Sequence, residues 1–575
     1  MGHTHSSIVD AQAQHPPRSI VRKQSKAAFS ALTLGCANSP ASFSPETYGS
    51  ITAVTERYRS DEKASFDPPP LYASFTVDIL EDSASGAYKL FLKQHPQYQL
   101  TWTLDALRRS DFARLDRTGE TYVDYMGGSL YPESLLRAQT DFLHRNILGN
   151  THSVSNSSKL SSTCANDARK AVLSFFRAPP GYTVVFTANA TGALKLVGES
   201  FPFTKGSVFV LGVDAHNSVH GIRNFAAQRG AQVHYIASTE HGGLEINDAK
   251  GILERNHPQN RRSFPSLFAL TGQSNISNTK NPLSLIHHAA SQGYYTLLDA
   301  AALAPTSMFS LTDHPVDAMA VSFYKMFGYP TGIGALIAKE EFLAQLDRPW
   351  FAGGTVDVVQ VPGMNVTMSS HQHERFEVRP DGTINYLNLS VITEGLRFLS
   401  AYLPFLPLRL SSLTSYLVSS LSQLRHESTG TPVVRVLSRV PSRQLTAIGE
   451  QSDTGSTVSV VFLFPSGEKI PISFVEYAAS RHNISLRTGC MCNLGAAAAM
   501  LGLDGTMDLV TEGTTKHGIE RHLGYEIGLV RISLGLASDF RDVYRVIRFA
   551  GMFAGAGITG PLWQDWLDTK TEELA

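Results

Sequence analysis

One lysine and one aspartate in this 575-residue chain have the types and positions that chemistry with an aldehyde cofactor requires. Lys325 follows the apolar run at 318–322 and enters a turn-rich segment, and Asp299 ends an earlier apolar run. Alone, the lysine would be read as a solvated strand end and the aspartate as a helix cap. Together they could serve pyridoxal phosphate, because the amine forms an imine with its aldehyde and a buried carboxylate keeps its ring nitrogen protonated. The pair predicts an enzyme.

Polar groups also follow other predicted strands. Thr191 lies where a strand meets a helix start, a place that favours phosphate, although an ordinary capped helix is the alternative. His216 follows the next strand and could stack on a flat ring, although a lone loop histidine is more often a surface or packing residue. Gln273 follows a further strand and offers an amide to a cofactor ring. Several such strand ends together favour one binding site.

A second chemical centre is the sequence Arg-Thr-Gly-Cys-Met-Cys-Asn, which holds Cys490 and Cys492. Cysteines one residue apart do not easily form an unstrained disulfide, and no other Cys/His pair has structural-zinc spacing. We therefore predict a reactive thiol and no metal site. Arg487 would favour the thiolate, and Gly489 with its polar neighbours indicates a mobile, accessible loop. The alternative is that both cysteines are inert small hydrophobes.

The elements that must position these groups are short apolar strands alternating with helical stretches. Continuous apolar runs with helices between them predict an α/β protein with a mostly parallel sheet covered on both faces. Ligands bind such sheets at the carboxyl ends of the strands. We expect strands at 182–187, 207–211, 232–236, 266–270, 295–299, 318–322 and 334–338, and helices at 191–199 and around 396–403.

Composition narrows the class of protein. The chain is 42% hydrophobic and 17% charged, enough for a large core, and its net charge of -1 gives no electrostatic case for binding nucleic acid or an anionic membrane. Four cysteines are too few for a disulfide framework, which fits a reducing compartment. We see no apolar stretch of about 18 residues, so we expect a soluble protein without a membrane span.

The amino-terminal residues have a different composition. Residues 1–70 are rich in Ser, Ala, Pro and Gln, which predicts a disordered extension. Positive charge is clustered there without clear amphipathic spacing, so we favour a flexible extension on a cytoplasmic protein. A mitochondrial transit peptide is the alternative, because Asp10 is the only acidic residue before Pro45.

The segments around these residues resemble class V aminotransferase-fold enzymes, most closely the amino-terminal cysteine desulfurase domain of molybdenum cofactor sulfurases. The resemblance covers roughly residues 87–553 and includes Gly-Asn-Thr-His-Ser at 149–153, Asn-Ser-Val-His-Gly-Ile-Arg at 217–223, and Arg-Phe-Glu at 375–377. It implies the pyridoxal phosphate-dependent transferase fold type I, with a mostly parallel central sheet and a smaller α+β carboxyl-terminal domain.

The resemblance also implies roles for the cofactor-binding residues. Lys325 would form the internal imine, Asp299 would pair with the ring nitrogen, His216 would stack on the ring and Gln273 would bond its oxygen. The phosphate would be held by Ala190, Thr191 and Ser322. In homodimeric relatives a Gly-Gly-Thr-like segment of the second subunit completes the phosphate site, which here implies Thr355 and a homodimer.

For the substrate, the resemblance implies that Arg531 holds a carboxylate, with Arg487 as a further substrate-binding candidate. The nucleophile falls on Cys492. Lys325 would remove the alpha proton of L-cysteine, and Cys492 would take the sulfur as a persulfide and leave L-alanine. A protein or a cofactor would then accept the sulfur.

Several positions depart from the family pattern. Tyr125 replaces an active-site histidine, Ala497 replaces a third cysteine, and residues 511–524 are an extra stretch at the expected entrance. The sequence ends at Ala575, so we expect no molybdenum-cofactor-binding domain. Three hypotheses stay open: a cysteine desulfurase, another pyridoxal phosphate enzyme such as a carbon-sulfur lyase or an aminotransferase of a specialised pathway, and a degenerate binding partner.

We predict the domain layout from the strands and the resemblance. Residues 71–122 form an arm that contributes to the small domain or the dimer surface. The large domain covers 123–390, the small domain covers 391–560, and 561–575 are a tail.

Overall fold

The computed structural model describes residues 77–574 apart from 350, 352–354, 369–375, 377–382, 509 and 556–559. The extension predicted to be disordered, 1–70, lies outside these residues. Among the described helices, none combines the length and the apolar character that crossing a membrane requires.

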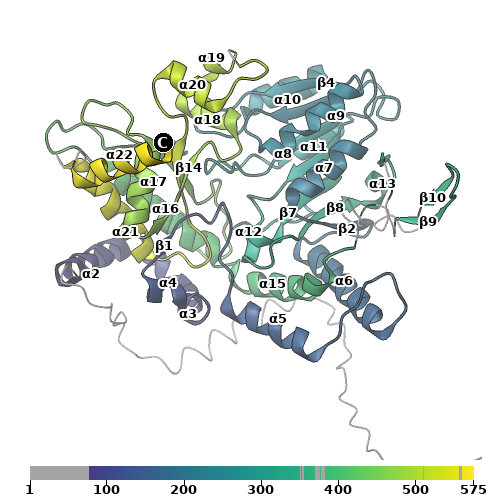
Figure 1. The fold of residues 1–575 in the computed structure, drawn as a ribbon, viewed down its shortest axis with the longest axis horizontal. Coiled ribbons are helices and arrows are strands. Elements are labelled where there is room, and N and C mark those ends of the chain that lie inside the picture. The colour runs from purple at the N-terminus through teal and green to yellow at the C-terminus, as the bar shows by residue number, and fades with distance from the viewer. Residues whose placement is uncertain are drawn as a thin grey trace, which may run out of the picture. The chain divides into compact units, whose positions relative to one another are not determined.

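The largest sheet has seven strands in the order β2-β8-β7-β6-β5-β3-β4 (Figure 1). β8 runs antiparallel to both of its neighbours, and the other pairs are parallel, which confirms the predicted α/β architecture with a mostly parallel sheet. The strands are β2 (Tyr182–Thr187), β3 (Val208–Gly212), β4 (Gln232–Ile236), β5 (Leu267–Thr271), β6 (Tyr295–Asp299), β7 (Ala318–Ser322) and β8 (Gly334–Lys339).

Both faces of this sheet are buried over its central strands, because β3, β5, β6, β7 and β8 are mostly apolar; the edge strand β4 is partly exposed. Side chains alternate between faces, so Val184 and Val185 enter different cores. One core is closed by α7 (Ala190–Ser200), α9 (Ile222–Gln228) and α13 (Glu340–Leu343). The other is closed by α6 (Asn156–Phe175), α10 (Ile246–Arg255), α11 (Ser284–Ser291) and α15 (Leu389–Tyr402).

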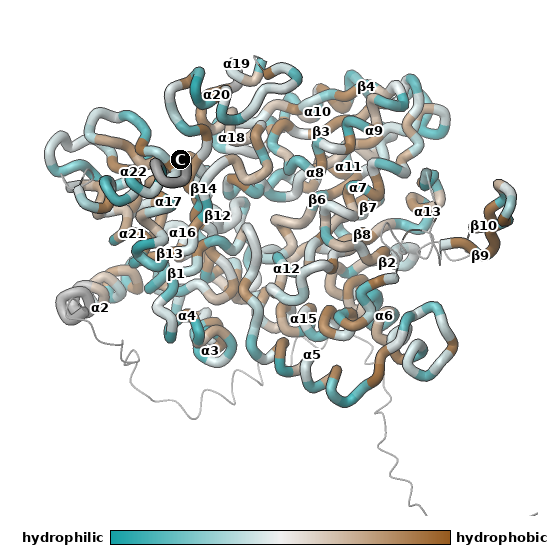
Figure 2. Tube along the Cα trace, viewed as in Figure 1, coloured by the Kyte–Doolittle hydropathy of each residue, from teal (hydrophilic) through white to brown (hydrophobic). Residues whose placement is uncertain are grey.

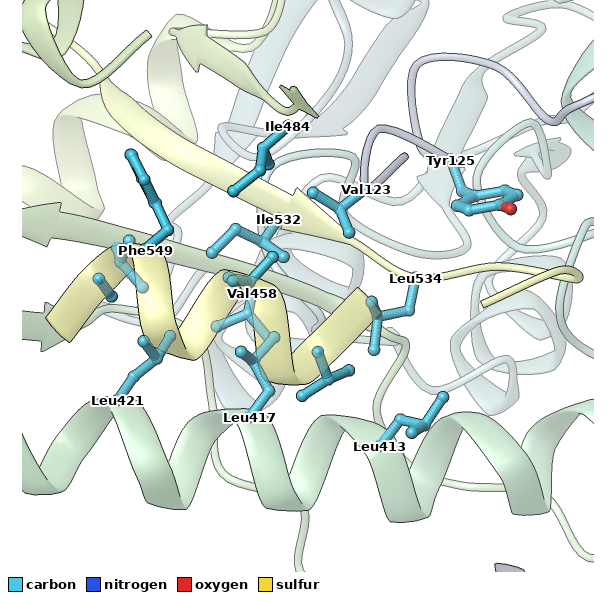
Figure 3. Close-up of a cluster of buried hydrophobic side chains, with 14 of the residues drawn as sticks. Val123, Tyr125, Leu413, Leu417, Leu421, Val458, Ile484, Ile532, Leu534 and Phe549 are labelled. Atoms are coloured by element: carbon cyan, nitrogen blue, oxygen red, sulfur yellow. The ribbon is translucent and has the colours of Figure 1, made fainter. Parts of the chain in front are cut away.

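A smaller antiparallel sheet has the order β11-β12-β15-β14. Its strands are β11 (Val434–Val436), β12 (Thr457–Phe462), β14 (Arg487–Gly489) and β15 (Leu529–Ser533). Successive turns of α16 (Leu406–Gln423) bring Leu413, Leu417 and Leu421 to its core, because residues four apart share one helix face (Figure 3). α17 (Ile472–Arg481) and α21 (Phe540–Gly551) contribute to the same core, and α21 packs beside α16.

Amino-terminal residues pack into the same core as this smaller sheet. Phe91, Tyr98 and Leu104 come from α2 (Val77–Gln94), η2 (Pro96–Thr101) and α3 (Trp102–Asp111). β1 (Thr121–Tyr122) pairs in parallel with β13 (Ile484–Ser485). The described part of the amino-terminal arm therefore packs against the small sheet, and the chain enters the large sheet only after it.

Further elements connect these layers. They are α4 (Ala113–Thr118), α5 (Glu133–Arg145), α8 (Asn217–His220), α12 (Phe323–Phe327), β9 (Val356–Val359), β10 (Val366–Met368), η3 (Tyr386–Asn388), α18 (Leu494–Leu501), α19 (Asp504–Met507), α20 (Lys516–Leu523), η4 (Met552–Ala554) and α22 (Pro561–Leu574).

Candidate active site

The strand register gathers the predicted site residues at one edge of the large sheet. Thr187 and Ser322, the last residues of β2 and β7, both lie opposite Gly334. Asp299 ends β6 opposite Ala320, and the carboxyl end of β5 lies beside it. α12 begins directly after β7 and carries Lys325 in its first turns. The parallel order of these strands thus brings distant side chains to one edge.

Lys325, Asp299 and His216 act on one another electrostatically. Burial lowers the pKa of Lys325, Asp299 opposes this shift, and nearby guanidinium groups add to it. Burial also lowers the pKa of His216, while Asp299 raises it and Lys325 lowers it. An amine with a lowered pKa is neutral, and therefore nucleophilic, at a lower pH than a free lysine. The structure brings these three predicted residues together.

The start of α7 forms a polar cradle beside them. The backbone amide of Ala190 donates to Ser322 Oγ at 2.8 Å, and the hydroxyl groups of exposed Thr191 and Ser218 are 2.8 Å apart. A Cβ at Gly334 would lie 2.5 Å from Asn189 Cα, so this close approach requires glycine. The predicted phosphate residues Ala190, Thr191 and Ser322 therefore share one helix start.

Gln273 is buried at the same edge of the sheet. A Cβ at Gly455 would lie 2.4 Å from Gln273 Nε2, so glycine leaves room for this amide. Within the described part of the chain, Gln273 Oε1 is buried and has no hydrogen-bond partner. An unpaired buried amide oxygen is costly, which is typical of a position that a bound group completes.

Two arginines meet across the strands of the small sheet. Arg487 on β14 lies opposite Arg531 on β15, and Asp124 lies between them with one oxygen 2.7 Å from each guanidinium group. Arg531 is only 2% exposed, and burial lowers its pKa although Asp124 opposes the shift. Burial also disfavours the charge of Arg487, but Asp124 outweighs this effect and raises its pKa. Both arginines also act on the pKa of Lys325, so they belong to the same site.

Asp124 is a residue of this site to which the sequence reasoning assigned no role. Its position directly before Tyr125, in the segment that replaces a family motif, was the available signal. Tyr125 itself is 6% exposed and belongs to the carboxyl-terminal core, where a Cβ at Gly535 would lie 2.2 Å from its ring. Ala497, the other departure, is also fully buried.

The segment that carries Cys492 combines an exposed thiol with a tightly held backbone. Met491 and Cys492 both have positive φ angles, 54° and 55°, which non-glycine residues rarely adopt. The amide of Asn217 donates to the Cys492 carbonyl at 2.8 Å, and Asn275 Nδ2 donates to the Met491 carbonyl at 2.7 Å. Asn493 caps α18. The expected accessibility is therefore present, but hydrogen bonds hold the loop that we expected to be mobile.

The remaining predicted residue, Thr355, precedes β9 and is fully buried. Gly353 and Gly354 lie outside the described residues, as do Arg375 and Glu377 of another family motif. The contribution of Thr355 to a second chain stays a prediction.

Comparison with known proteins identifies the family. The model of the aminotransferase class-V family matches residues 121–546. The chain belongs to the class V aminotransferase family. This result confirms the resemblance that the motifs around Lys325 and Asp299 predicted.

Curated relatives of this chain include molybdenum cofactor sulfurases. The protein of Bos taurus is 34% identical over 481 residues, which cover 78% of this chain and 51% of that protein. The protein of Solanum lycopersicum is 33% identical over 478 residues, covering 78% and 56%. The chain thus spans about half the length of the curated relatives it matches.

Solved structures confirm the fold. A cysteine desulfurase from Thermococcus onnurineus NA1 superimposes with a TM-score of 0.61 at 21% identity, covering 78% of this chain and 98% of that one. A cysteine desulfurase of Escherichia coli gives a TM-score of 0.59 at 19% identity, with the same coverage. The class V aminotransferase chain therefore has the fold of these enzymes.

Proposed function

We propose that this chain is a pyridoxal phosphate-dependent cysteine desulfurase that converts L-cysteine to L-alanine and keeps the sulfur as a persulfide on Cys492. The observation that carries the proposal is the convergence of Lys325 and Asp299 with a buried arginine, Arg531, and an exposed thiol. The curated relatives that are molybdenum cofactor sulfurases support it.

The described residues fit pyridoxal phosphate. Lys325 has a lowered pKa, the start of α7 gathers the hydroxyl groups of Thr191, Ser218 and Ser322 for a phosphate, and buried Gln273 Oε1 lacks a partner in the described chain. When bound, the cofactor supplies an electron-withdrawing ring that stabilises negative charge on the substrate's alpha carbon. Asp299 would hold a proton on the ring nitrogen, and His216 would lie against the ring.

The substrate side has its own set of groups. Arg531 would bind the cysteine carboxylate, because its Nε is buried without a partner among the described residues. Lys325 Nζ would take the alpha proton. Cys492 Sγ would take the substrate sulfur. L-cysteine and the enzyme thiol would then become L-alanine and the enzyme persulfide, with no atom gained or lost. Arg487 interacts electrostatically with Cys492.

A homodimer is part of the proposal. The hairpin of β9 and β10 follows Thr355 and exposes Val358, Val361 and Met364, with 58%, 84% and 94% of their surfaces accessible. Figure 2 shows this hairpin as a hydrophobic projection from the body of the protein. A second copy of the chain would cover such apolar residues. A reactive thiol at Cys492 also favours the reducing cytoplasm as the location.

Replacing Cys492 by serine tests the function. We expect Cys492→Ser to bind pyridoxal phosphate with an unchanged visible spectrum but to form no persulfide and no alanine from L-cysteine. Cys164→Ser, which removes a half-buried thiol from α6, is the matched control. Mass spectrometry of the protein and assay of alanine give the readouts. Alanine formation by Cys492→Ser at the unmodified rate would refute the role of Cys492. Release of pyruvate and sulfide from L-cysteine by this variant at the unmodified rate, without alanine, would refute the desulfurase and favour the lyase hypothesis.

A further inference from the structure

A cavity opens beside Cys492, and neither Lys325 nor Arg531 lines it. Its volume is about 340 Å³, within the range of small-molecule sites. Its walls come from the cysteine segment, from α18, and from the α19–α20 region that contains the extra stretch of sequence (Figure 1). The lining residues that bear on what would bind are Cys492, Leu503, Met507, Lys516 and Ile519.

Cys492 therefore lies between two spaces. On one side, Arg487 interacts electrostatically with Cys492 and with Lys325. On the other side, Cys492 lines the cavity, whose lining includes neither Lys325 nor Arg531. The hydrogen bond from Asn217 to the Cys492 carbonyl holds the backbone between them. A sulfur atom on Cys492 would thus be reachable from a compartment that is not the donor site.

The chemistry of the cavity wall limits what would bind there. Most lining side chains are apolar, including Leu503, Met507 and Ile519. Among the described lining residues, Lys516 alone carries a full charge, and its side chain is 54% exposed. Glu520 lies 3.2 Å from Lys516 and accepts from the amide of Ile527, so it neutralises part of that charge. Among the described residues Glu520 is the only ion-pair partner of Lys516, which leaves further ammonium donors for an anion.

We propose that this cavity binds the sulfur acceptor, and that the acceptor is a small organic thiol with an apolar body and one anionic group. The inference rests on the proposed desulfurase function. The acceptor thiolate attacks the outer sulfur of the Cys492 persulfide, an acceptor–sulfur bond forms, and the bond to Cys492 Sγ breaks. Cys492 leaves as a thiolate, and its sulfur is reduced as the acceptor sulfur is oxidised. No external oxidant or reductant is required.

Binding is tested first without turnover. Full-length protein is alkylated with iodoacetamide in the presence of heptanoate, heptanol or heptylamine, and mass spectrometry follows Cys492 and Cys490. We expect saturable protection with a preference of roughly two- to fivefold for heptanoate over heptanol, the size of an exposed ion pair. Equal protection by all three compounds, or no protection, would overturn the proposal.

Charge reversal at the cavity wall sharpens this test. Lys516→Glu places a carboxylate at the start of α20, where the helix dipole favours it, so the helix is expected to persist. We expect the preference to change from heptanoate to heptylamine. Arg521→Glu makes the same charge change on the same helix, at an exposed residue that does not line the cavity, and is expected to keep the heptanoate preference. Identical behaviour of the two variants would contradict the role of Lys516.

Sulfur discharge is measured second. Protein carrying labelled persulfide is mixed with 6-mercaptohexanoate, 6-mercaptohexanol or 6-mercaptohexylamine, whose thiols differ little in reactivity. We expect saturable and fastest loss of label with the anionic thiol. Persulfide formation with equal discharge by all three would overturn the acceptor inference alone. Absence of any persulfide would overturn the proposed function, and the alkylation test would still decide whether the cavity binds anions.

Discussion

The carboxyl edge of the large sheet and the wall formed by the small sheet build the candidate site in different ways. At the sheet edge, neighbouring strands bring Ala190, Ser322 and Asp299 together through regular pairing. At the wall, Asp124 joins Arg531 and Arg487, which come from the other end of the chain. The first arrangement follows from strand register, and the second depends on buried charge.

This difference separates cofactor chemistry from substrate recognition. Most residues proposed to hold the cofactor lie at the carboxyl ends of the large-sheet strands or in the segments that follow them, where the sheet backbone positions them. The residues proposed to hold the substrate and its sulfur are held by long-range hydrogen bonds, such as that from Asn275 to Met491. Substitutions at the edge are therefore expected to affect chemistry, and substitutions at the wall are expected to affect stability and binding.

The largest effect is expected at the sheet edge. Lys325→Ala removes the amine proposed to move the alpha proton, and we expect turnover to fall by at least about 10³-fold, with loss of the bound cofactor's visible absorption. Lys195→Ala, at an exposed position on α7, is the control and is expected to keep full activity. Steady-state assays and absorbance measure both. Retention of activity by Lys325→Ala would show that the carboxyl edge of the large sheet is not the site of chemistry.

The next effect is a loss of stability at the wall. Asp124→Asn leaves the buried guanidinium group of Arg531 without a full counter-charge, and we expect the free energy of unfolding to fall by about 2 kcal/mol. Asp167→Asn changes an exposed carboxylate on α6 and is expected to have little effect. Urea unfolding followed by circular dichroism measures both variants. Equal stability of the two variants would show that Asp124 does not compensate the positive charges of Arg531 and Arg487.

Arg531 and Arg487 are expected to differ from each other. Arg531→Lys keeps the positive charge but loses the planar, bidentate hydrogen bonding to a carboxylate. We therefore expect kcat/KM for L-cysteine to fall about tenfold, mainly through a higher KM. Arg487→Lys is expected to change it less, because the Arg487 side chain is 51% exposed. Steady-state kinetics distinguish the two. A larger effect at Arg487 would reverse the assignment of the carboxylate site.

The smallest effect is a change in pH dependence. The neutral amine of Lys325 captures the cofactor, so the rate of pyridoxal phosphate binding by the cofactor-free protein is expected to rise with pH. The midpoint is expected below 10.5, the usual pKa of lysine, because burial and the guanidinium groups of Arg531 and Arg487 favour the neutral form, while Asp299 and Asp124 oppose them.

Arg487→Gln removes one of those positive charges and is expected to move the midpoint to higher pH. Arg481→Gln changes an exposed arginine that pairs with Asp565. It is the control and is expected to leave the midpoint unchanged. Absorbance-monitored mixing over a pH series measures both. A shift to lower pH in Arg487→Gln would contradict the electrostatic link between wall and edge.

Local sequence patterns predicted most of the sheet and its edge. β2, β4, β6 and β7 have the expected bounds. β2, β6 and β7 are mostly apolar and end at a polar residue, whereas β4 is a mixed, partly exposed strand at the sheet edge. The same patterns placed Lys325 and Asp299 at strand ends. They could not predict that Asp124 pairs with Arg531 and Arg487, because nothing in the sequence near Asp124 indicates residues that are distant along the chain.

The sequence by itself therefore determined the α/β class, the order of the strands' polar ends and the chemical types gathered there, since side-chain periodicity and strand polarity are local properties. Only the tertiary structure decided which charges share a site and how Cys492 is presented. Asp124 pairs with two arginines because the segment after β1 bridges to Ser533 at the end of β15. The hydrogen bonds on the cysteine loop come from Asn217 and Asn275, which follow strands of the large sheet. Buried charges require partners, and which partners they find depends on the folded chain.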